Sequence, residues 1–374
     1  MYVINAEVDG SIYQIDPLHS YQFETMIVEI TSKCNLRCIF CPKSIRGNDQ
    51  IPGRDMDMPA DQIDQTLALT RELKPHSVAM VGIGELTFRK DWLEVAERFF
   101  EHDTAFTLNS NFGRIYSDAE LDALLRFSAI TISIESADPV IQKELRKAVD
   151  LSKIVTNIRA LQQRARMRGM PLPELRVNCT VSDRNAYGIY DLAELCVELD
   201  INQFNLSSFY EMDGLEGHGI HSIDHLSANQ LGIVAREMTK IRENLANSNT
   251  RLDIQPRLYQ LVMGNDETLA LAQGDTRICT QPWDTFTFAA DGQVFPCCVQ
   301  VDAFGHVSEP LETIVNGPAI KKLRQQLLEG DLPEMCKDCS NAPLGKKEQL
   351  MQTVSLKALR TGKVPKVGQT APGR

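Results

Sequence analysis

Between residues 26 and 208, short apolar runs rich in β-branched side chains alternate with longer stretches whose apolar residues recur with a helical period. This rhythm is typical of parallel strands joined by crossover helices. The apolar runs predict six strands, over residues 26–30, 77–81, 105–109, 129–134, 175–181 and 203–207. The stretches between them predict helices over residues 59–72, 91–101, 117–127, 152–168 and 190–198.

Six such repeats indicate an α/β fold, a partial (β/α)6, TIM-like barrel. In that architecture the active site lies at the carboxyl ends of the strands. Four polar or cysteine-rich motifs fall there, one after each of the first four predicted strands. They are the cysteine loop that starts at residue 34 and the segments 82–85, 109–111 and 133–136.

The remainder of the chain has a different pattern. Residues 222–271 are helical in period, most clearly over 228–246, and Asp291-Gly292 between two apolar runs predicts a tight hairpin. We therefore expect five parts, the last of them basic and mobile. They are an N-terminal extension (1–25), the barrel (26–221), a helical connection (222–274), a small cysteine-rich domain (275–345) and the tail (346–374).

Composition narrows the class of protein. The chain has 374 residues, 43% of them apolar, which is enough for one large domain and a smaller appendage. No apolar run approaches the roughly 20 residues that cross a bilayer, and the first residues lack the features of a secretion signal. We expect a cytoplasmic protein without a membrane partner. The net charge of −11 argues against nucleic acid as a partner, because such surfaces are basic.

Ten cysteines without a secretion signal indicate metal ligands rather than disulfides. Cys34, Cys38 and Cys41 can supply three thiolates to a four-iron cluster and leave the fourth iron without a protein ligand. An electron-transfer cluster usually takes four cysteines, so an open iron indicates a place where chemistry begins. Short cysteine spacings also occur in zinc sites, so the residues alone do not exclude a zinc-binding loop.

The spacing of these cysteines, with Phe40 before the last one, resembles the CxxxCx(aromatic)C signature of the radical S-adenosylmethionine (radical SAM) enzymes. The resemblance implies a [4Fe–4S] cluster whose free iron chelates S-adenosylmethionine. An electron, from a flavodoxin- or ferredoxin-like donor, would split the cofactor's S–C bond, and the resulting 5′-deoxyadenosyl radical would abstract a substrate hydrogen atom.

The resemblance continues over roughly residues 26–210 and implies a pocket for S-adenosylmethionine. Gly82, Gly84 and Glu85 resemble a Gly-Gly-Glu motif that receives the methionine amino group, although Ile83 separates the two glycines. The other implied contacts are Ser133 and Glu135 for the ribose, Arg146 for the methionine carboxylate, Phe40 near the adenine, and Asn109 and Asn178 at strand ends. The alternatives are a solvated helix end for Arg146, core packing for Phe40 and strand capping for the two asparagines.

Four further cysteines form a second set. Cys279, Cys297, Cys336 and Cys339 suit either tetrahedral zinc or a fully ligated [4Fe–4S] cluster. Their spacing around Gly292 resembles the auxiliary-cluster domain of the SPASM/twitch branch of radical SAM enzymes. No cysteine follows Cys339, which favours the shorter, twitch-like form with one auxiliary cluster.

The remaining cysteines are ambiguous. Adjacent strand residues point to opposite faces, so only one of Cys297 and Cys298 should reach the cluster, and the spacing favours Cys297. Cys179 and Cys196 lie in apolar contexts typical of buried structural thiols. Cys179, near a strand end, could instead donate a hydrogen atom to a substrate radical.

A fully ligated second cluster can accept an electron from a substrate radical, which favours dehydrogenation. We expect a small-molecule substrate: a sugar, an aminocyclitol or a related natural-product intermediate. The alternatives are a peptide maturase, a redox-neutral sugar epimerase and a non-catalytic iron–sulfur scaffold. Only 33 residues precede Cys34, fewer than a leader-peptide-binding domain needs. Candidates for a base are Tyr210, Glu211, Asp213, His218 and His221.

Overall fold

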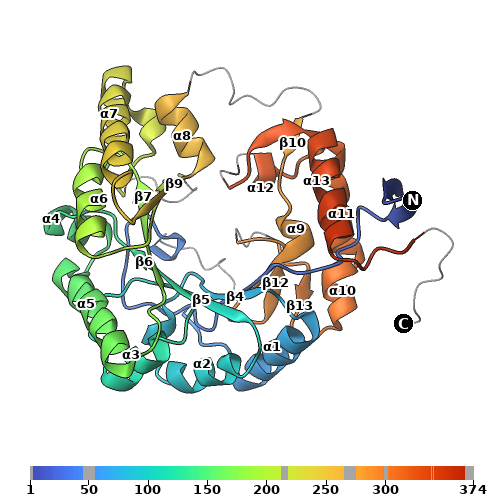
Figure 1. The fold of residues 1–374 in the computed structure, drawn as a ribbon, viewed down its shortest axis with the longest axis horizontal. Helices are drawn as coiled ribbons and strands as arrows, with labels where there is room; N and C mark the ends of the chain where they lie inside the picture. Colours follow the sequence, from blue (N-terminus) through green and yellow to red (C-terminus); the bar gives the residue numbers. More distant parts are fainter. Residues whose placement is uncertain are drawn as a thin grey trace. The chain divides into compact units, whose positions relative to one another are not determined.

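A computed structural model describes residues 3–44, 55–211, 218–264, 275–298, 302–337, 339 and 341–366 (Figure 1). The chain divides into two compact units. We call residues 29–58 and 79–268 the barrel unit, and residues 1–28, 59–78 and 269–374 the mixed unit.

The strands are β1 (Ile4–Val8), β2 (Ser11–Ile15), β3 (Thr25–Val28), β4 (Ser77–Met80), β5 (Ala105–Ser110), β6 (Ala129–Ser133), β7 (Glu174–Val181), β8 (Gln203–Ser208), β9 (Arg251–Ile254), β10 (Asp275–Arg277), β11 (Thr285–Phe288), β12 (Gln293–Phe295), β13 (Gly305–His306) and β14 (Leu344–Lys346). The α-helices are α1 (Ala60–Leu73), α2 (Trp92–Phe100), α3 (Asp118–Leu124), α4 (Pro139–Leu145), α5 (Leu151–Arg168), α6 (Ile189–Glu198), α7 (Ala228–Leu245), α8 (Pro256–Met263), α9 (Gln281–Asp284), α10 (Leu311–Asn316), α11 (Pro318–Glu329), α12 (Glu334–Lys337) and α13 (Lys347–Arg360). Three 3-10 helices are η1 (Pro42–Ser44), η2 (Leu86–Phe88) and η3 (Ile223–His225).

All six strands and all six helices predicted between residues 26 and 246 are present, with bounds that differ by at most three residues, whereas helix α4 was not predicted. In the barrel unit, β5, β6, β7, β8 and β9 lie in that order, and every neighbouring pair is parallel. The partial barrel is therefore confirmed. Strand β9 was not predicted, because its four residues lie within a stretch that we expected to be helical throughout.

Three helices of this unit, α3, α4 and α5, begin at polar side-chain caps. Ser117 and Glu120 form a reciprocal capping box at the start of α3, and Asp138 and Asp150 accept backbone N–H bonds at the starts of α4 and α5. These caps satisfy N–H groups that the first helical turn leaves without partners. They help to determine where these three helices start.

The strands of the barrel unit have two different faces. Phe106, Ile132, Val177 and Phe204 belong to a buried face, and Figure 1 shows α3, α5 and α6 along the outer side of these strands. The opposite face, which we call the polar face, is half-buried or exposed except at Ala129. Its side chains are Thr107, Asn109, Thr131, Ser133, Glu174, Arg176, Asn178, Thr180, Gln203, Asn205 and Ser207, beside Ala105 and Ala129.

In the mixed unit, the strand order is β13-β12-β11-β3-β4. The predicted hairpin is confirmed: β11 pairs antiparallel with β12, and Gly292 lies in the turn with a φ of 82°. Strand β11 also pairs in parallel with β3, with Thr285 opposite Thr25. The segment that we expected in a separate small domain therefore shares a sheet with the first predicted strand.

The C-terminal segment differs from our prediction of a mobile tail. Residues 347–360 form α13, whose Leu350 and Val354 are buried in one cluster with Trp283 and Leu327. The prediction was wrong because it weighed the basic residues and not the apolar ones, which recur every four positions and give the helix a buried side. Residues 367–374 lie outside the described part.

The N-terminal extension also has regular structure. Strands β1 and β2 form an antiparallel hairpin, and Ile15 is fully buried in a cluster with Ala358 and Val364. Across the described residues, every helix is too short or too polar to span a bilayer.

Candidate active site and auxiliary metal centre

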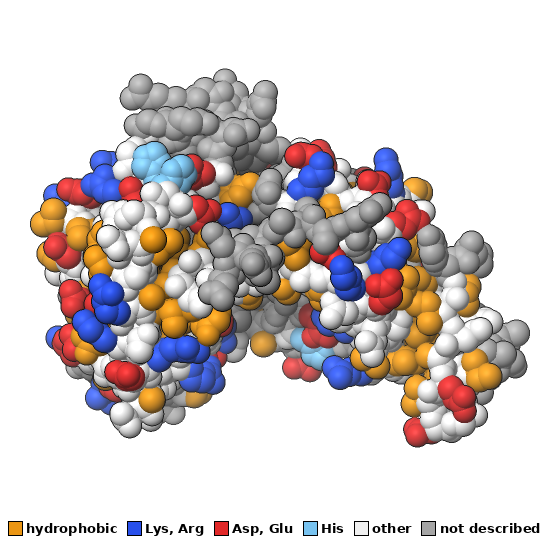
Figure 2. Space-filling view, turned by 90° about the horizontal axis from the view of Figure 1, so that it is seen from above, with side chains coloured by type: hydrophobic (Ala, Val, Ile, Leu, Met, Phe, Trp, Pro, Cys, Tyr) orange, Lys and Arg blue, Asp and Glu red, His pale blue; other side chains and the backbone are white. Residues whose placement is uncertain are grey.

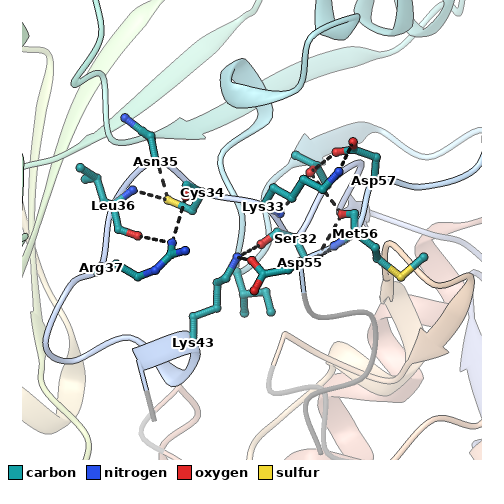
Figure 3. Close-up of polar contacts among 12 residues, drawn as sticks. Ser32, Lys33, Cys34, Asn35, Leu36, Arg37, Lys43, Asp55, Met56 and Asp57 are labelled. Carbon is teal, nitrogen blue, oxygen red and sulfur yellow. Dashed lines mark hydrogen bonds and ion pairs between the residues drawn. The ribbon is translucent and has the colours of Figure 1, made fainter. Parts of the chain in front are cut away.

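The cysteine loop of the barrel unit is anchored on both sides by backbone and ionic contacts (Figure 3). The Ser32 N–H donates to the Met56 carbonyl at 2.9 Å, and the Met56 N–H donates to the Ser32 hydroxyl at 2.9 Å. Beyond the last cysteine, the buried Lys43 ammonium pairs with Asp55 at 2.6 Å and donates to the Ser32 carbonyl. These bonds hold the start and the end of the loop together.

The three predicted cluster cysteines lie in this loop, Cys38 buried and Cys34 and Cys41 half-buried. Burial raises the pKa of the Cys38 thiol to about 12, against the opposing effect of Arg146, and the other two thiols also interact with it. Burial likewise raises the pKa of Cys34 and of Cys41. Three thiols converging from one anchored loop fit an iron–sulfur cluster with a free iron.

Gly82 and Gly84 contact the chain that leads into this loop. A Cβ at Gly84 would lie 2.0 Å from the Thr31 carbonyl oxygen, and one at Gly82 would lie 2.3 Å from the Glu29 side chain. Both positions therefore require glycine. The two glycines thus allow a close approach to the chain that leads into the cysteine loop, where we had predicted a close approach to a ligand.

Glu85 is buried beside the same loop. Its carboxylate accepts from the Asn111 N–H at 2.7 Å and from the hydroxyls of Ser110 and Thr87 at 2.9 and 2.8 Å. Its own N–H donates to the Lys33 carbonyl at 2.8 Å. Glu85 thus connects the cysteine loop to the end of β5.

At the end of β5 the sequence pointed to Asn109, but the structure points to Asn111. Asn109 is exposed on the polar face. The Asn111 amide donates to the Asn35 side chain at 2.9 Å and lies 3.9 Å from the Cys34 sulfur. The predicted strand ended at residue 109, one residue before the end of β5, so we took Asn109 as the residue at the strand end. The motif 109–111 already included Asn111.

Glu135 and Arg146 bind one another. Nε and Nη2 of Arg146 donate to one Glu135 oxygen at 2.9 and 2.5 Å, and the other oxygen accepts from the Thr180 N–H at 2.5 Å. The Glu135 side chain is fully buried, and Arg146 Nη1 lies 3.9 Å from the Cys38 sulfur. Arg146 is therefore a buried cation beside the cluster cysteines rather than a solvated helix end.

The other predicted contacts divide between two places. Phe40 packs in a cluster with Leu145 and Phe209, and the Arg146 guanidinium lies 5.4 Å from the centre of its ring. Ser133 and Asn178 lie in register with one another on the polar face. The structure thus brings Phe40 and Arg146 to the cysteine loop and leaves Ser133 and Asn178 half-buried on neighbouring strands.

The two isolated cysteines are fully or almost fully buried. Cys179 lies on the face of β7 opposite Asn178, and its thiol contacts the Glu135 carbonyl oxygen at 3.6 Å. Burial raises its pKa well above the ordinary value for a thiol. Cys196 is buried in α6, and burial likewise raises its pKa.

The candidate bases follow β8. Tyr210 is exposed, whereas the His218 ring is half-buried and its Nδ1 lies 2.9 Å from the Ile39 carbonyl oxygen of the cysteine loop. Glu211 lies beside His221 and also beside His225, which sequence reasoning did not single out. Asp213 lies outside the described residues.

In the mixed unit, Cys279, Cys297, Cys336 and Cys339 line one cavity of about 180 Å³. Burial raises the pKa of Cys279 to about 12, and the other three thiols interact with it. Four thiols around one cavity fit a fully ligated cluster. Cys298, the alternative to Cys297, does not line this cavity, is exposed and accepts a bond from Asn341 at 3.4 Å.

Arg277 holds the second pair of these cysteines, and sequence reasoning missed it. Its guanidinium donates to the carbonyls of Cys336 and Ala342 at 3.0 and 3.2 Å and also to that of Lys337. Burial raises the pKa of Cys336 to about 11, and the arginine charge opposes this rise. A single side chain thus orients the CxxC segment.

Comparison with known families agrees with both sites. Residues 28–170 match the model of the radical SAM superfamily, and residues 279–340 match SPASM, an iron–sulfur cluster-binding domain. The chain contains a radical SAM domain followed by a SPASM domain. The two matched ranges contain all seven predicted cluster cysteines. The cofactors of this radical SAM protein are S-adenosylmethionine and [4Fe–4S] clusters.

Curated relatives are more distant. A probable GTP 3′,8-cyclase of Sulfolobus acidocaldarius is 28% identical over 192 residues, which is 50% of this chain and 57% of that relative. A probable GTP 3′,8-cyclase of Methanococcus maripaludis is 23% identical over 304 residues, 80% of this chain and 93% of that relative. The chain thus spans little more than half the length of the first relative.

Solved structures share the fold. SuiB of Streptococcus suis bound to S-adenosylmethionine superposes with a TM-score of 0.60 at 17% identity, over 81% of this chain and 68% of SuiB. The enzyme anSMEcpe with bound AdoMet superposes with a TM-score of 0.56 at 15% identity, over 90% of this chain and 97% of that one. Radical SAM proteins with these folds act on small molecules or on peptides.

Proposed function

We propose that this radical SAM protein dehydrogenates a small hydroxylated substrate, such as a sugar, an aminocyclitol or a related natural-product intermediate. When bound, S-adenosylmethionine and the two clusters supply hydrogen-atom abstraction and an acceptor for the electron left on the substrate. A flavodoxin- or ferredoxin-like protein is the proposed electron donor. The chain's own residues bind the substrate and accept the hydroxyl proton.

The polar face of the barrel unit supports this proposal most directly. Rows of hydrogen-bonding side chains cross the strands in register, for example Ser133, Asn178 and Asn205, with Thr180 opposite Ser207 in the next row. Each of these side chains can donate and accept hydrogen bonds. A surface of this kind suits a substrate with many hydroxyl groups better than an apolar one.

The charges on the same face favour a neutral or cationic substrate over a nucleoside triphosphate, the substrate in the relatives' printed activity. Arg176 and Arg251 both pair with Glu174. In the next row, the exposed Asp253 lies opposite Asn205. Two cations and two carboxylates leave this face without net charge, whereas triphosphate binding needs uncompensated cations. Asp253 is a suitable partner for an amino group.

His218 is the proposed proton acceptor. A carbonyl oxygen cannot donate, so the Nδ1 that faces Ile39 must carry the proton, which leaves Nε2 with a free lone pair. The same contact holds the ring against the cysteine loop. Oxidation of a carbinol carbon requires loss of its hydroxyl proton, which is the step that this nitrogen would assist.

The test is an anaerobic assay of the reconstituted enzyme with S-adenosylmethionine and reductant against a panel of aminocyclitols, sugars, GTP and short peptides. We expect 5′-deoxyadenosine in equal amount to a product two mass units lighter, and only with the hydroxylated compounds. Turnover of GTP or of a peptide would overturn the substrate class. Solvent deuterium retained at carbon would indicate an epimerase instead.

Variants separate binding from proton transfer. Asn205→Ala should raise KM about tenfold through the loss of a substrate hydrogen bond, whereas the exposed Asn247→Ala serves as the control without effect. His218→Gln should lower kcat by about 10²-fold and remove one limb of the pH profile. An unchanged pH profile in His218→Gln would exclude this histidine as the base.

A further inference from the structure

Beyond the proposed function, we propose that Glu211, His221 and His225 form a binding site for a divalent transition-metal ion, and specifically for Zn²⁺. One ligand atom from each of these three side chains lies within 4.8 Å of the other two. On the face shown in Figure 2, histidine side chains in pale blue gather at the surface beside acidic side chains. None of the three residues belongs to either set of cluster cysteines.

The distances match zinc coordination. The Glu211 carboxylate oxygen lies 3.1 Å from His225 Nε2 and 3.6 Å from His221 Nδ1. Zinc bonds to nitrogen and oxygen of about 2.0–2.1 Å give a tetrahedron with edges of about 3.3 Å. The two measured separations bracket that edge. The third separation, between the two histidine nitrogens, is within 4.8 Å, so an ion could bind all three atoms once the two imidazoles move closer together.

The backbone pre-orients the three ligands. The Ser222 N–H donates to the same Glu211 oxygen at 2.7 Å. The His221 N–H donates to the Asp183 carboxylate at 2.8 Å, and the Asp183 N–H donates to the His221 carbonyl at 3.0 Å. His225 ends the 3-10 helix η3, which Ser222 caps. The Glu211 carboxylate is thus oriented directly by a hydrogen bond, as ligating carboxylates in metal sites are, and the two histidines are fixed at their backbones.

The residue types select the metal. Two imidazoles and one carboxylate form a ligand set that zinc uses with a water or another ligand in the fourth position, and nitrogen donors favour zinc over magnesium or calcium. The three side chains are 40–59% exposed, so the fourth position is open to solvent. A magnesium ion would instead need mainly oxygen ligands.

An ion here would connect Glu211, shortly after the end of β8, to His221 and His225 further along the chain. Glu211 and His221 lie ten positions apart in the sequence. Next to them, Phe209 and Ile220 pack with Leu145, Ile39 and Phe40 against the cysteine loop. An ion held by His221 would restrain Ile220 beside it, and therefore also residues 218–220, which include His218.

The experiment is calorimetric titration of the anaerobic, cluster-loaded enzyme with ZnCl₂. We expect one binding event that Glu211→Gln and His225→Gln each weaken about tenfold or more. His76→Gln, an exposed histidine of the mixed unit, is the matched control and should bind zinc as the wild type does. Iron content and thermal unfolding check that each variant is folded.

Chemical modification locates the ion independently of affinity. Zinc should protect His221 and His225, but not His76, from diethyl pyrocarbonate, as read by peptide mass spectrometry. Equal zinc affinity in the wild type and both ligand variants would overturn the proposal. So would reaction of His221 and His225 at the same rate with and without zinc, which would leave the cluster as an ordinary polar contact between Glu211 and the two imidazoles.

Discussion

Single side chains determine how closely the cysteine loop can be held. A Cβ at Gly84 would clash with the Thr31 carbonyl oxygen. Arg146 binds the buried Glu135 carboxylate and also contacts the Cys38 sulfur. Both contacts lie within the barrel unit, and neither depends on the bound cofactor. Substitutions at these residues should therefore affect the apo-protein as well as the loaded one.

Gly84→Ala should displace the loop, because backbone atoms cannot yield to a Cβ 2.0 Å from the Thr31 oxygen. We expect loss of the first cluster, about half of the iron, and of S-adenosylmethionine binding. Gly188→Ala is the matched control, since a Cβ there meets nothing within 4 Å. Iron and sulfide analysis after reconstitution decides; full iron in Gly84→Ala would refute the packing argument.

Arg146→Met should lower the free energy of unfolding by about 3–5 kcal/mol, because it leaves the Glu135 carboxylate buried without its cation. The double variant Glu135→Gln/Arg146→Met should be less destabilised than the single one. Urea unfolding of the apo-proteins measures both. An equal or larger loss in the double variant would mean that packing, and not charge, dominates at this site.

At the scale of elements, amphipathic periodicity predicted the crossover helices but was overlooked in the C-terminal segment. Helix α13 buries Leu350 and Val354 against Trp283 and Leu327 and exposes Lys347 and Arg360, whereas Lys357 is half-buried and pairs with Asp284. The charge composition of this segment alone indicated a mobile tail. A helix with many basic residues can nevertheless pack against a core if one of its sides is apolar. This segment is part of the core of the mixed unit.

Leu350→Ala should therefore destabilise the protein by about 2–5 kcal/mol, the usual effect of truncating a fully buried leucine. Leu356→Ala on the same helix, where the side chain is 47% exposed, should change stability by less than about 0.5 kcal/mol. Chemical denaturation of both variants is the measurement. Similar small losses in the two would place α13 outside the core.

At the scale of the whole molecule, the two cysteine sets lie in different units and should load independently. Replacing Cys34, Cys38 and Cys41 by Ala should remove the first cluster and leave about half of the iron, since the four thiols of the SPASM domain are untouched. Replacing Cys279, Cys297, Cys336 and Cys339 should remove the other half. A variant of the first kind without any iron would contradict the assignment of the second set.

Metal loading should also depend on pH. Because burial raises the pKa values of the cysteine thiols, loading should be weaker at low pH. Burial raises the pKa of Cys38 to about 12 and that of Cys336 to about 11, so these thiols are protonated near neutrality and must lose protons to bind metal. Raised thiol pKa values favour the metal-free form at low pH, and affinity should rise steadily from about pH 7 to about pH 9. Co²⁺ binding to the apo-protein, followed by its thiolate absorption, measures this. A plateau below about pH 8 would mean that the thiols titrate lower.

The local patterns in the sequence were enough to predict six strands and most crossover helices, the hairpin at Gly292 and both cysteine sets, but not helix α4 or strand β9. Strand period, helix period, caps and ligand spacing are set by neighbouring residues, so one sequence suffices to find them. The pairing of β9 with β8 and of β11 with β3 was not foreseen. Four-residue strands have little periodicity, and their partners are chosen by register across the sheet.

The site shows the same division. The sequence by itself determined which thiols are available for clusters, because the spacing of ligands along a loop is a local property. Only the tertiary structure decided that Asn111 rather than Asn109 lies at Cys34, that Glu135 binds Arg146, and that Glu211 meets His221 and His225. These contacts join residues from separate elements, and their geometry depends on how the elements pack, which no local pattern contains.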